Sequence, residues 1–269
     1  MRRGSSRLLA AVGLWMAVSR NQYGEHSFFL YFLFIFAGMK FYPTYSFVAV
    51  LLVMFSFIPV KSAEGERLSA PARRMAKAGF VNVREKDPTI FVSLMYSRKD
   101  NFTGTVLYTE LREAYLHPKA MAALKKAQKR LKQLRPDLSL KVYDAARPMS
   151  IQQKMWDKVK NTSKNIYVSN PAHGGGMHNY GMAVDITLCN LRGDTIPMGT
   201  KIDYMGAAAH IDKEQQLVAR HRISRQALAN RRLLRSVMRY AGWRPLRTEW
   251  WHFNMCSRAT ARKYYKVIP

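Results

Sequence analysis

Apolar residues recur at helical spacing in two long stretches of the chain. In the first stretch, Pro118 can open a helix that ends before Pro136. Its inward stripe, with positions three or four apart, consists of Met121, Leu124, Ala127, Gln128, Leu131 and Leu134. The second stretch runs from Ser224 to Ala241, and Gly242 follows as a stop. Its inward positions are Leu228, Leu234, Val237, Met238 and Ala241.

Shorter stretches have the pattern of strands. Residues 89–95 are apolar and precede a loop rich in Asn, Gly and Thr, and residues 138–144 alternate between apolar and polar. Ser150 with Gln153 resembles a capping box for a helix through Lys158. Helices and strands alternate too irregularly for a doubly wound sheet, so we expect an α+β domain.

Two segments, 174–188 and 248–255, carry an unusual set of polar residues. In the second, alternation predicts a strand with His252 on one face and Trp251 and Phe253 on the opposite, core-facing side. In the first, an apolar face made by Val184, Ile186 and Leu188 leaves Asp185 on the other side. Asp185 and His252 are therefore expected on the open side of buried strands.

A third polar side chain can join this pair. His178 precedes the first strand across Gly181, where a turn could fold the imidazole back towards Asp185. Two imidazoles and one carboxylate form a three-ligand zinc site with a fourth position open to water. Glu249 could act as general base if it lies at a twisted strand entrance, although a flat strand would place it on the opposite face from His252. The alternative for each residue alone is a hydrogen-bonded structural role.

The first 63 residues differ in kind from the rest. They contain one acid and two apolar runs, 28–39 and 41–60, separated only by Lys40. Residues 39–63 have a short positive start, an apolar stretch and small residues at the end, which is the pattern of a secretory signal peptide. The alternative is a membrane anchor over residues 28–60. Residues 1–38 are then an upstream extension, and an exported, periplasmic or envelope-associated protein is expected.

Composition and charge restrict the function classes. Of 269 residues, 48% are apolar, which excludes disorder as a description of the whole chain. The net charge is +27; six basic residues and one acid precede residue 64, so residues 64–269 carry +22. This charge favours electrostatic association with an anionic cell envelope. We expect no nucleic-acid partner, because no recognition motif is present and the lysines of residues 123–135 lie mostly on the solvated face of a helix.

Cysteine usage limits the metal chemistry. With only Cys189 and Cys256, the chain has neither a disulfide framework nor a Cys-rich zinc module, so a metal must use histidines and carboxylates. If the two strands that carry Asp185 and His252 run antiparallel, the cysteines lie in opposite directions from the site. In that arrangement we expect two free and largely buried thiols, whereas a parallel pair would bring the cysteines together.

Five spaced motifs carry a resemblance to a known family. They are MYSRKDNFTG (95–104), YDAARP (143–148), HNYGMAVDITL (178–188), PMGTKID (197–203) and EWWH (249–252). In this order they resemble the zinc-dependent D-alanyl-D-alanine dipeptidases. The resemblance implies a mainly antiparallel central sheet flanked by helices, with zinc on its open face. The catalytic domain would cover residues 89–269, after a linker and lead-in segment at 64–88.

The resemblance also implies roles for individual residues. It places one zinc ion per chain on His178, Asp185 and His252. It assigns Glu249 as catalytic base and Arg147 as the cation that stabilises the oxyanion, and it places Tyr96 and Asp203 near the amino end of the substrate. A surface salt bridge for Arg147 and a turn cap for Asp203 are the structural alternatives. One departure stands at Gly176, where the family usually has a serine two residues before the first zinc histidine, so a side-chain hydrogen bond to substrate is missing.

These features predict a zinc peptidase that hydrolyses D-Ala-D-Ala or a related D,D-dipeptide. Asp203 fits a free substrate ammonium, which longer peptidoglycan stems would not offer. The alternatives are a D,D-carboxypeptidase that acts on such stems, or a non-catalytic exported binder of anionic wall components. A pure binder would need neither Glu249 nor Arg147. The sequence gives no oligomeric state.

Overall fold

The computed structural model describes residues 68–268. The expected upstream extension, the expected signal peptide or anchor at 39–63 and the first residues of the expected linker lie outside the described residues. Within residues 68–268, no helix is both long and apolar enough to span a membrane.

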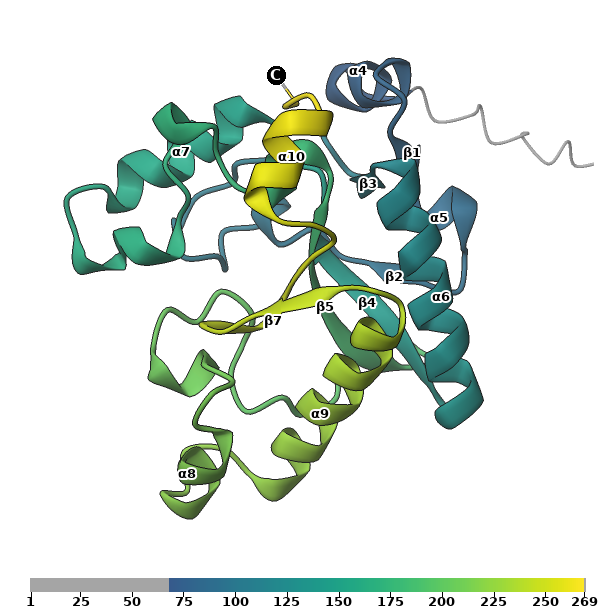
Figure 1. Cartoon of the computed structure of the whole chain (residues 1–269), viewed down its shortest axis with the longest axis vertical. Coiled ribbons are helices and arrows are strands. Elements are labelled where there is room, and N and C mark those ends of the chain that lie inside the picture. The colour runs from purple at the N-terminus through teal and green to yellow at the C-terminus, as the bar shows by residue number, and fades with distance from the viewer. Residues whose placement is uncertain (1–67, 269) are drawn as a thin grey trace, which may run out of the picture. The chain divides into compact units, whose positions relative to one another are not determined.

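A five-stranded mixed sheet forms the centre of the fold (Figure 1). Its strands, in spatial order, are β2 (Phe91–Val92), β4 (Leu138–Asp144), β5 (Ala183–Asn190), β7 (Glu249–Asn254) and β6 (Arg244–Leu246). Three of its neighbouring pairs are antiparallel and one, β2 with β4, is parallel. The expected α+β class with a mainly antiparallel sheet therefore holds, and β2 is shorter than the strand expected at 89–95. Beside it, β1 (Val81–Asn82) pairs antiparallel with β3 (Tyr115–Leu116).

Helices surround the sheet. They are α4 (Ala70–Lys77), α5 (Val83–Lys86), α6 (Pro118–Leu134), α7 (Met149–Val159), α8 (Glu214–Ala219), α9 (Arg225–Tyr240) and α10 (Arg258–Tyr264). Short 3-10 turns are η1 (Met95–Ser97), η2 (Ser163–Tyr167), η3 (Pro171–His173), η4 (Met177–Tyr180) and η5 (Ala207–Ala209). The two longest helices, α6 and α9, pack against each other and against sheet strands, with α6 on β4 and α9 on β5 and β6 (Figure 1).

The predicted ends of the long helices agree with the structure, but one predicted cap does not. Ser224 caps α9 through its Oγ, which accepts a hydrogen bond from the Ala227 N–H at 3.0 Å. In α7, Pro148 precedes the first turn and Ser150 lies inside the helix, so the expected capping box is wrong. Proline fixes a backbone conformation suited to a helix start, and the helix begins before the serine can cap it.

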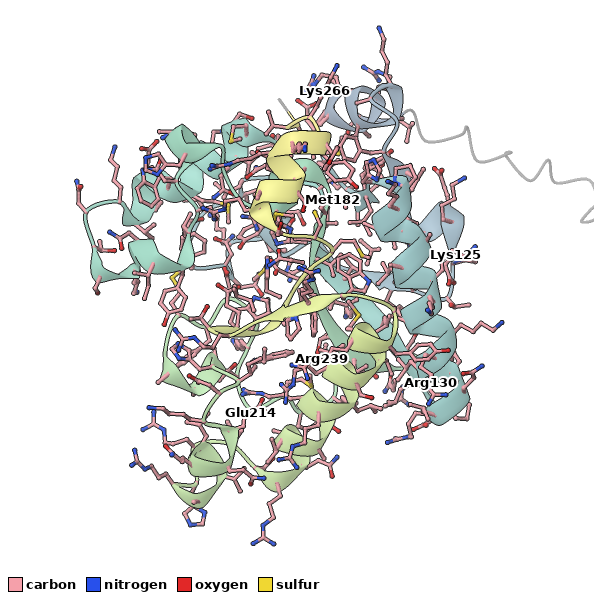
Figure 2. The ribbon with its side chains drawn as sticks, viewed as in Figure 1. Lys125, Arg130, Met182, Glu214, Arg239 and Lys266 are labelled. Carbon is pink, nitrogen blue, oxygen red and sulfur yellow. The ribbon has the colours of Figure 1, made fainter. Side chains whose placement is uncertain are left out.

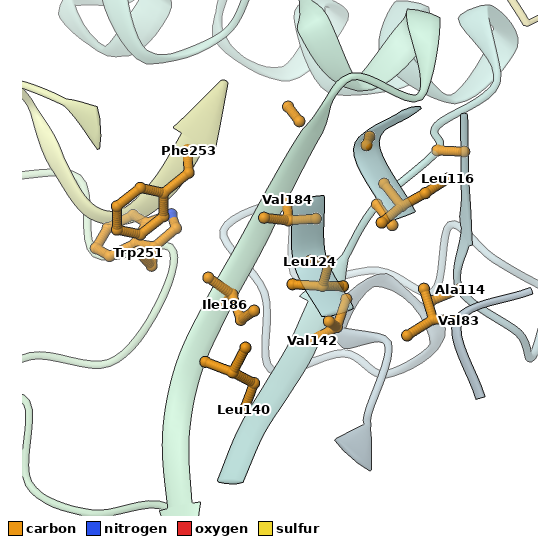
Figure 3. Packing of buried hydrophobic residues seen from close by; sticks show 14 of the residues in the cluster. Val83, Ala114, Leu116, Leu124, Leu140, Val142, Val184, Ile186, Trp251 and Phe253 are labelled. Atoms are coloured by element: carbon orange, nitrogen blue, oxygen red, sulfur yellow. The ribbon is translucent and has the colours of Figure 1, made fainter. Parts of the chain in front are cut away.

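The apolar face of the sheet lies against α6 (Figure 3). Val142 of β4 and Val184 and Ile186 of β5 are fully buried, and Leu124 of α6 lies beside them. This confirms the predicted core face of β5. The outer side of α6 carries exposed lysines such as Lys125 (Figure 2), as expected for a solvated helix face.

The opposite face of β7 is less open than the sequence suggests. Trp250, which stands two residues before His252 and so shares its strand face, is only 3% exposed. Its indole Nε1 donates a hydrogen bond to Thr200 Oγ1 at 2.7 Å, so the loop after β5 covers this part of the sheet. The site is consequently a cavity between the sheet and its loops.

The strand directions also explain why the two cysteines do not form a disulfide. Strands β5 and β7 are antiparallel, with Asp185 opposite His252. Cys189 and Cys256 are both free, as expected from that orientation. Cys189 is buried, whereas Cys256 is only half-buried because it follows the end of β7.

The segment after α10 returns to the centre of the molecule. The Ile268 N–H donates to the Asn179 carbonyl at 2.7 Å, and the Met149 N–H donates to the Ile268 carbonyl at 2.8 Å. The side chain of Ile268 is buried. This segment therefore joins the η4 turn to the start of α7.

Candidate active site

Three neighbouring strands place polar side chains in one row. Asp144 of β4 is paired with Asp185 of β5, and Asp185 is paired with His252 of β7. Residues directly opposite each other in a sheet project on the same face. The Asp185 Oδ1 and His252 Nδ1 atoms are 3.0 Å apart, so the pair that sequence alternation predicted lies in contact.

His178 reaches this row through a tight turn. It lies in η4, and Gly181 follows with a left-handed φ of +62°. A Cβ at Gly181 would lie 2.4 Å from the Phe80 ring and 3.0 Å from the His117 backbone nitrogen, so glycine is required there. The turn brings His178 Nε2 to 3.3 Å from Asp185 Oδ1, as the sequence led us to expect.

Hydrogen bonds to the outer nitrogens determine which nitrogen of each imidazole presents a lone pair to the site. His178 Nδ1 lies 2.7 Å from the Ala145 carbonyl oxygen, which can only accept, so this nitrogen carries the proton. His252 Nε2 lies 2.8 Å from Asn254 Oδ1. The inner nitrogens, His178 Nε2 and His252 Nδ1, are then lone-pair donors only 3.2 Å apart, beside the Asp185 carboxylate.

This donor set fits a metal ion. One ligand atom from each of His178, Asp185 and His252 can be chosen so that all lie within 4.8 Å of one another. Two facing lone pairs and a carboxylate repel unless a cation lies between them. The three buried side chains therefore could hold a divalent ion, and nitrogen and carboxylate ligands suit zinc.

The same groups set the charge of Asp185. Burial by itself raises the pKa of this carboxyl group, but the adjacent imidazoles of His178 and His252 outweigh burial and hold the pKa well below its usual range. Asp185 is therefore ionised, as a ligand must be.

Glu249 lies at the entrance of β7, on the same cavity. The pairing of β6 with β7 shifts register between Pro245 and Leu246, so that Leu246 lies opposite Glu249. A flat strand would place Glu249 on the opposite face from His252. The irregularity instead brings Glu249 Oε2 to 3.9 Å from His252 Nδ1. The pKa of Glu249 is raised to about 8, mainly by burial; His252 opposes this rise and Asp185 adds to it.

Arg147 is held by two side chains that sequence reasoning did not single out. Its Nε and Nη2 donate to Asp144 Oδ2 at 2.9 and 2.5 Å, and its Nη1 donates to Gln152 Oε1 at 2.9 Å. Burial lowers the pKa of Arg147, but Asp144 and then Tyr96 and Tyr108 outweigh burial and raise it. The surface salt bridge considered as an alternative is excluded, because Arg147 is 7% exposed.

Asp144 is the aspartate of the YDAARP motif and stands three residues before Arg147. It is fully buried and also accepts a hydrogen bond from the Tyr108 hydroxyl at 2.7 Å. A buried carboxylate three residues before a buried arginine is a signal that could have been read from the sequence. Gln152 gives no such signal, since its helix pattern alone does not distinguish it.

Tyr96 and Asp203 form a separate part of the cavity wall. The Tyr96 hydroxyl donates to Asp203 Oδ1 at 3.0 Å, and the Phe102 N–H donates to Asp203 Oδ2 at 2.9 Å. Burial raises the pKa of Asp203 to about 6, and the Phe102 hydrogen bond opposes that rise. Asp203 also has a left-handed φ of +68°, a strained conformation that occurs often at functional sites.

All the predicted site residues line one cavity of about 140 Å³. These are Tyr96, Arg147, Gly176, His178, Asp185, Asp203, Glu249 and His252. The lining also includes Ser169 and Arg258, which the sequence analysis did not identify. The cavity therefore combines a metal-type donor set, a buried carboxylate, a buried arginine and an acidic wall.

Comparison with known proteins agrees with this geometry. Residues 76–269, well over half of the chain, match the family described as D-Ala-D-Ala dipeptidase. The chain belongs to the D-Ala-D-Ala dipeptidase family. The family consists of metal-dependent hydrolases, and in this member the residues suited to hold a metal are His178, Asp185 and His252.

Individual relatives carry the same name. The chain is 32% identical over 173 residues to a D-alanyl-D-alanine dipeptidase of Escherichia coli, covering 64% of this chain and 82% of the relative. It is 29% identical over 176 residues to a D-alanyl-D-alanine dipeptidase of Streptomyces coelicolor, covering 60% of this chain and 83% of the relative. A dipeptidase of Enterococcus faecium is 31% identical over 110 residues, covering 40% of this chain and 48% of the relative.

Proposed function

We propose that this chain hydrolyses D-Ala-D-Ala, or a closely related D,D-dipeptide, with one zinc ion held on the sheet face by His178, Asp185 and His252. The observation that carries the proposal is the convergence of these three side chains with Glu249 and Arg147 in one cavity. The membership in a dipeptidase family supports the reaction class. The substrate comes from the names of the relatives.

The metal supplies Lewis-acid polarisation of the peptide carbonyl and lowers the pKa of a water molecule when it is bound. His178 and His252 direct their inner nitrogens to the ion because Ala145 and Asn254 occupy the outer nitrogens. Asp185 adds the negative charge that a divalent ion requires.

Glu249 accepts the proton of the attacking water and later gives it to the leaving amine. Burial raises its pKa and a bound cation beside it would lower that pKa again, and a carboxylate with a pKa near the working pH can take up and release a proton. The carboxylate is 3.9 Å from the His252 nitrogen, and the donor set of His178, Asp185 and His252 is complete without it.

Arg147 stabilises the oxygen that becomes negative during attack. Its guanidinium has five N–H donors, of which Asp144 and Gln152 take three, so two donors remain for the substrate. Because Nε and Nη2 both donate to Asp144 Oδ2, the guanidinium is fixed before reaction, and its hydrogen bond to the substrate oxygen strengthens as charge develops.

Asp203 binds the free ammonium of the dipeptide, with Tyr96 holding the carboxylate in place. This favours a dipeptidase over a D,D-carboxypeptidase, because the amino end of a longer stem peptide carries no ammonium at this position. The half-buried Asp203 carboxylate, which lines the cavity, supports this assignment.

We further propose that residues 39–63 direct export, so that the enzyme works in the periplasm or at the cell envelope. The net charge of +22 on residues 64–269 supports electrostatic association with anionic wall or lipid components. A non-catalytic binder of such components is the second candidate, and the charge is the observation that favours it.

Hydrolysis assays on a panel of D,D- and L,L-dipeptides test the proposed function. We expect cleavage of D-Ala-D-Ala that is lost with a chelator and restored by zinc, with one zinc per chain by elemental analysis. Activity that persists in metal-free protein would contradict the zinc assignment, and turnover of stem peptides alone would favour the carboxypeptidase.

A further inference from the structure

A dipeptide has a carboxylate as well as an ammonium, and few cations face the cavity. Among the described residues that line it, the side chains with a permanent positive charge are Arg147 and Arg258. Arg147 is bound to Asp144 and Gln152 and lies 3.7 Å from Asp185, so its charge is already balanced. Within residues 68–268, no carboxylate lies within 4 Å of the Arg258 guanidinium.

Arg258 is held at the cavity by Ser169. Its Nη2 donates to Ser169 Oγ at 3.2 Å, and both residues line the cavity. The Ser169 backbone is fixed in turn, because its carbonyl accepts a hydrogen bond from Gln152 Nε2 at 2.8 Å. Gln152 also holds Arg147, so a single side chain links the arginine of the catalytic centre to the segment that positions Arg258.

The Ser169 hydroxyl lies where a side chain at position 176 would point. A Cβ built on Gly176 would lie 2.9 Å from Ser169 Oγ and 3.2 Å from Ser169 Cβ. The glycine therefore leaves room for a hydroxyl that arrives from another segment of the chain. The hydrogen bond that the sequence suggested was missing at Gly176 has a donor nearby in Ser169.

We propose that Arg258 and Ser169 together bind the C-terminal carboxylate of the substrate. The guanidinium supplies the charge and a planar pair of donors, and the hydroxyl adds a third donor next to it. Asp203 and Arg258 then give the cavity an acidic and a basic subsite, which match the two charges of a dipeptide. This inference rests on the proposed function for the identity of the ligand.

Binding of D-Ala-D-Ala and of its C-terminal amide, D-alanyl-D-alaninamide, tests the inference. Calorimetry on zinc-loaded Glu249→Gln protein avoids consumption of either ligand. We expect the acid to bind more tightly than the amide, and Arg258→Ala to weaken the acid by about ten- to hundred-fold with little effect on the amide. Ser169→Ala should weaken the acid by a smaller factor, and Arg258→Lys should retain part of the preference.

Lys263→Ala is the matched control, because Lys263 is an exposed cation on the same helix, α10, and does not line the cavity. It should leave both affinities unchanged. Equal weakening of acid and amide by Arg258→Ala, or no weakening of either, would overturn the inference. If the native protein fails to hydrolyse the dipeptide while the acid preference depends on Arg258, the proposed function falls and the inference stands. Absence of binding by both ligands contradicts both.

Discussion

Glu249 is the residue whose removal separates catalysis from metal binding. It lies half-buried beside His252 but is not needed to complete the donor set. Glu249→Gln keeps the shape of the side chain and removes the basic oxygen. We expect zinc content to stay at one per chain while kcat falls by about 10²- to 10⁴-fold.

Steady-state kinetics with parallel metal analysis checks this expectation. Glu110→Gln is the control, because it changes an exposed carboxylate. Glu214→Gln would not serve, because Glu214 is buried in an ion pair. Near-normal turnover in the Glu249 variant would show that another group is the base.

The proposed role of Asp203 predicts that substrate binding depends on pH. Burial raises the pKa of this carboxyl group to about 6, with Tyr96, Asp185 and Arg147 as its charged or polar neighbours. A carboxyl group with a raised pKa gains a proton as the pH falls through about 6, and the neutral form no longer attracts an ammonium. We therefore expect the dissociation constant of the dipeptide to rise below pH 6 and to level off above it.

Calorimetric titrations at several pH values measure this effect. Asp203→Asn should bind the dipeptide weakly at every pH and lose the inflection near pH 6. An unchanged inflection in that variant would assign the titration to a different group.

Residue-level chemistry was the most predictable part of this protein. Strand alternation placed Asp185 and His252 on one face, and the Gly181 turn placed His178 with them, because both inferences depend only on local geometry. The contacts of Gln152 required tertiary information, since its side chain joins Arg147 to Ser169, which lies in a separate segment that no spacing connects. Arg258 was missed for the same reason.

At the scale of elements, Arg231 of α9 holds the loop that carries Asp203. Its Nε donates to the Met198 carbonyl at 2.6 Å, and its Nη2 donates to the Ala208 carbonyl at 3.0 Å. Its Nη1 lies 3.7 Å from the buried carboxylate of Glu214. Through Arg231, α9 therefore holds the loop at Met198 and at Ala208, on either side of Asp203.

Arg231→Met should lower the free energy of unfolding by about 3 kcal/mol, because buried carbonyls lose their donors and Glu214 loses one partner. It should also raise KM, since the loop positions Asp203. Urea unfolding and kinetics provide the two readouts. Arg232→Met changes the exposed neighbour in the same helix and should alter neither the free energy of unfolding nor KM. Equal stability of the two variants would contradict the role of Arg231 in holding the loop.

Some helices and strands could be predicted from the sequence more closely than others. The long helices α6 and α9 could be predicted to within a residue or two, because proline, serine and glycine mark their ends. The expected strand at 89–95 contracts to Phe91–Val92, because the chain turns at Met95 to bring Tyr96 into the cavity. That turn depends on tertiary contacts, which local propensity does not contain.

At the scale of the whole molecule, net charge and catalysis should respond differently to salt. A dipeptide is a zwitterion without net charge, so the field of a chain with a net charge of +27 neither steers nor repels it strongly. We expect kcat/KM to change by less than about two-fold as NaCl is raised, whereas retention on an anionic polymer should fall steeply. A parallel loss of both would favour the binder over the enzyme.

The hydrogen bonds of Ile268 tie the site to the order of protein synthesis. Translation produces Ile268 after all the residues that line the cavity, yet its backbone supplies the partner of Asn179, next to His178, and of Met149, two residues beyond Arg147. A nascent chain that has already exposed all the candidate catalytic residues still lacks this connection. The η4 turn and the start of α7 are joined through Ile268 only when the segment after α10 has emerged, so we expect removal of that segment to lower peptidase activity.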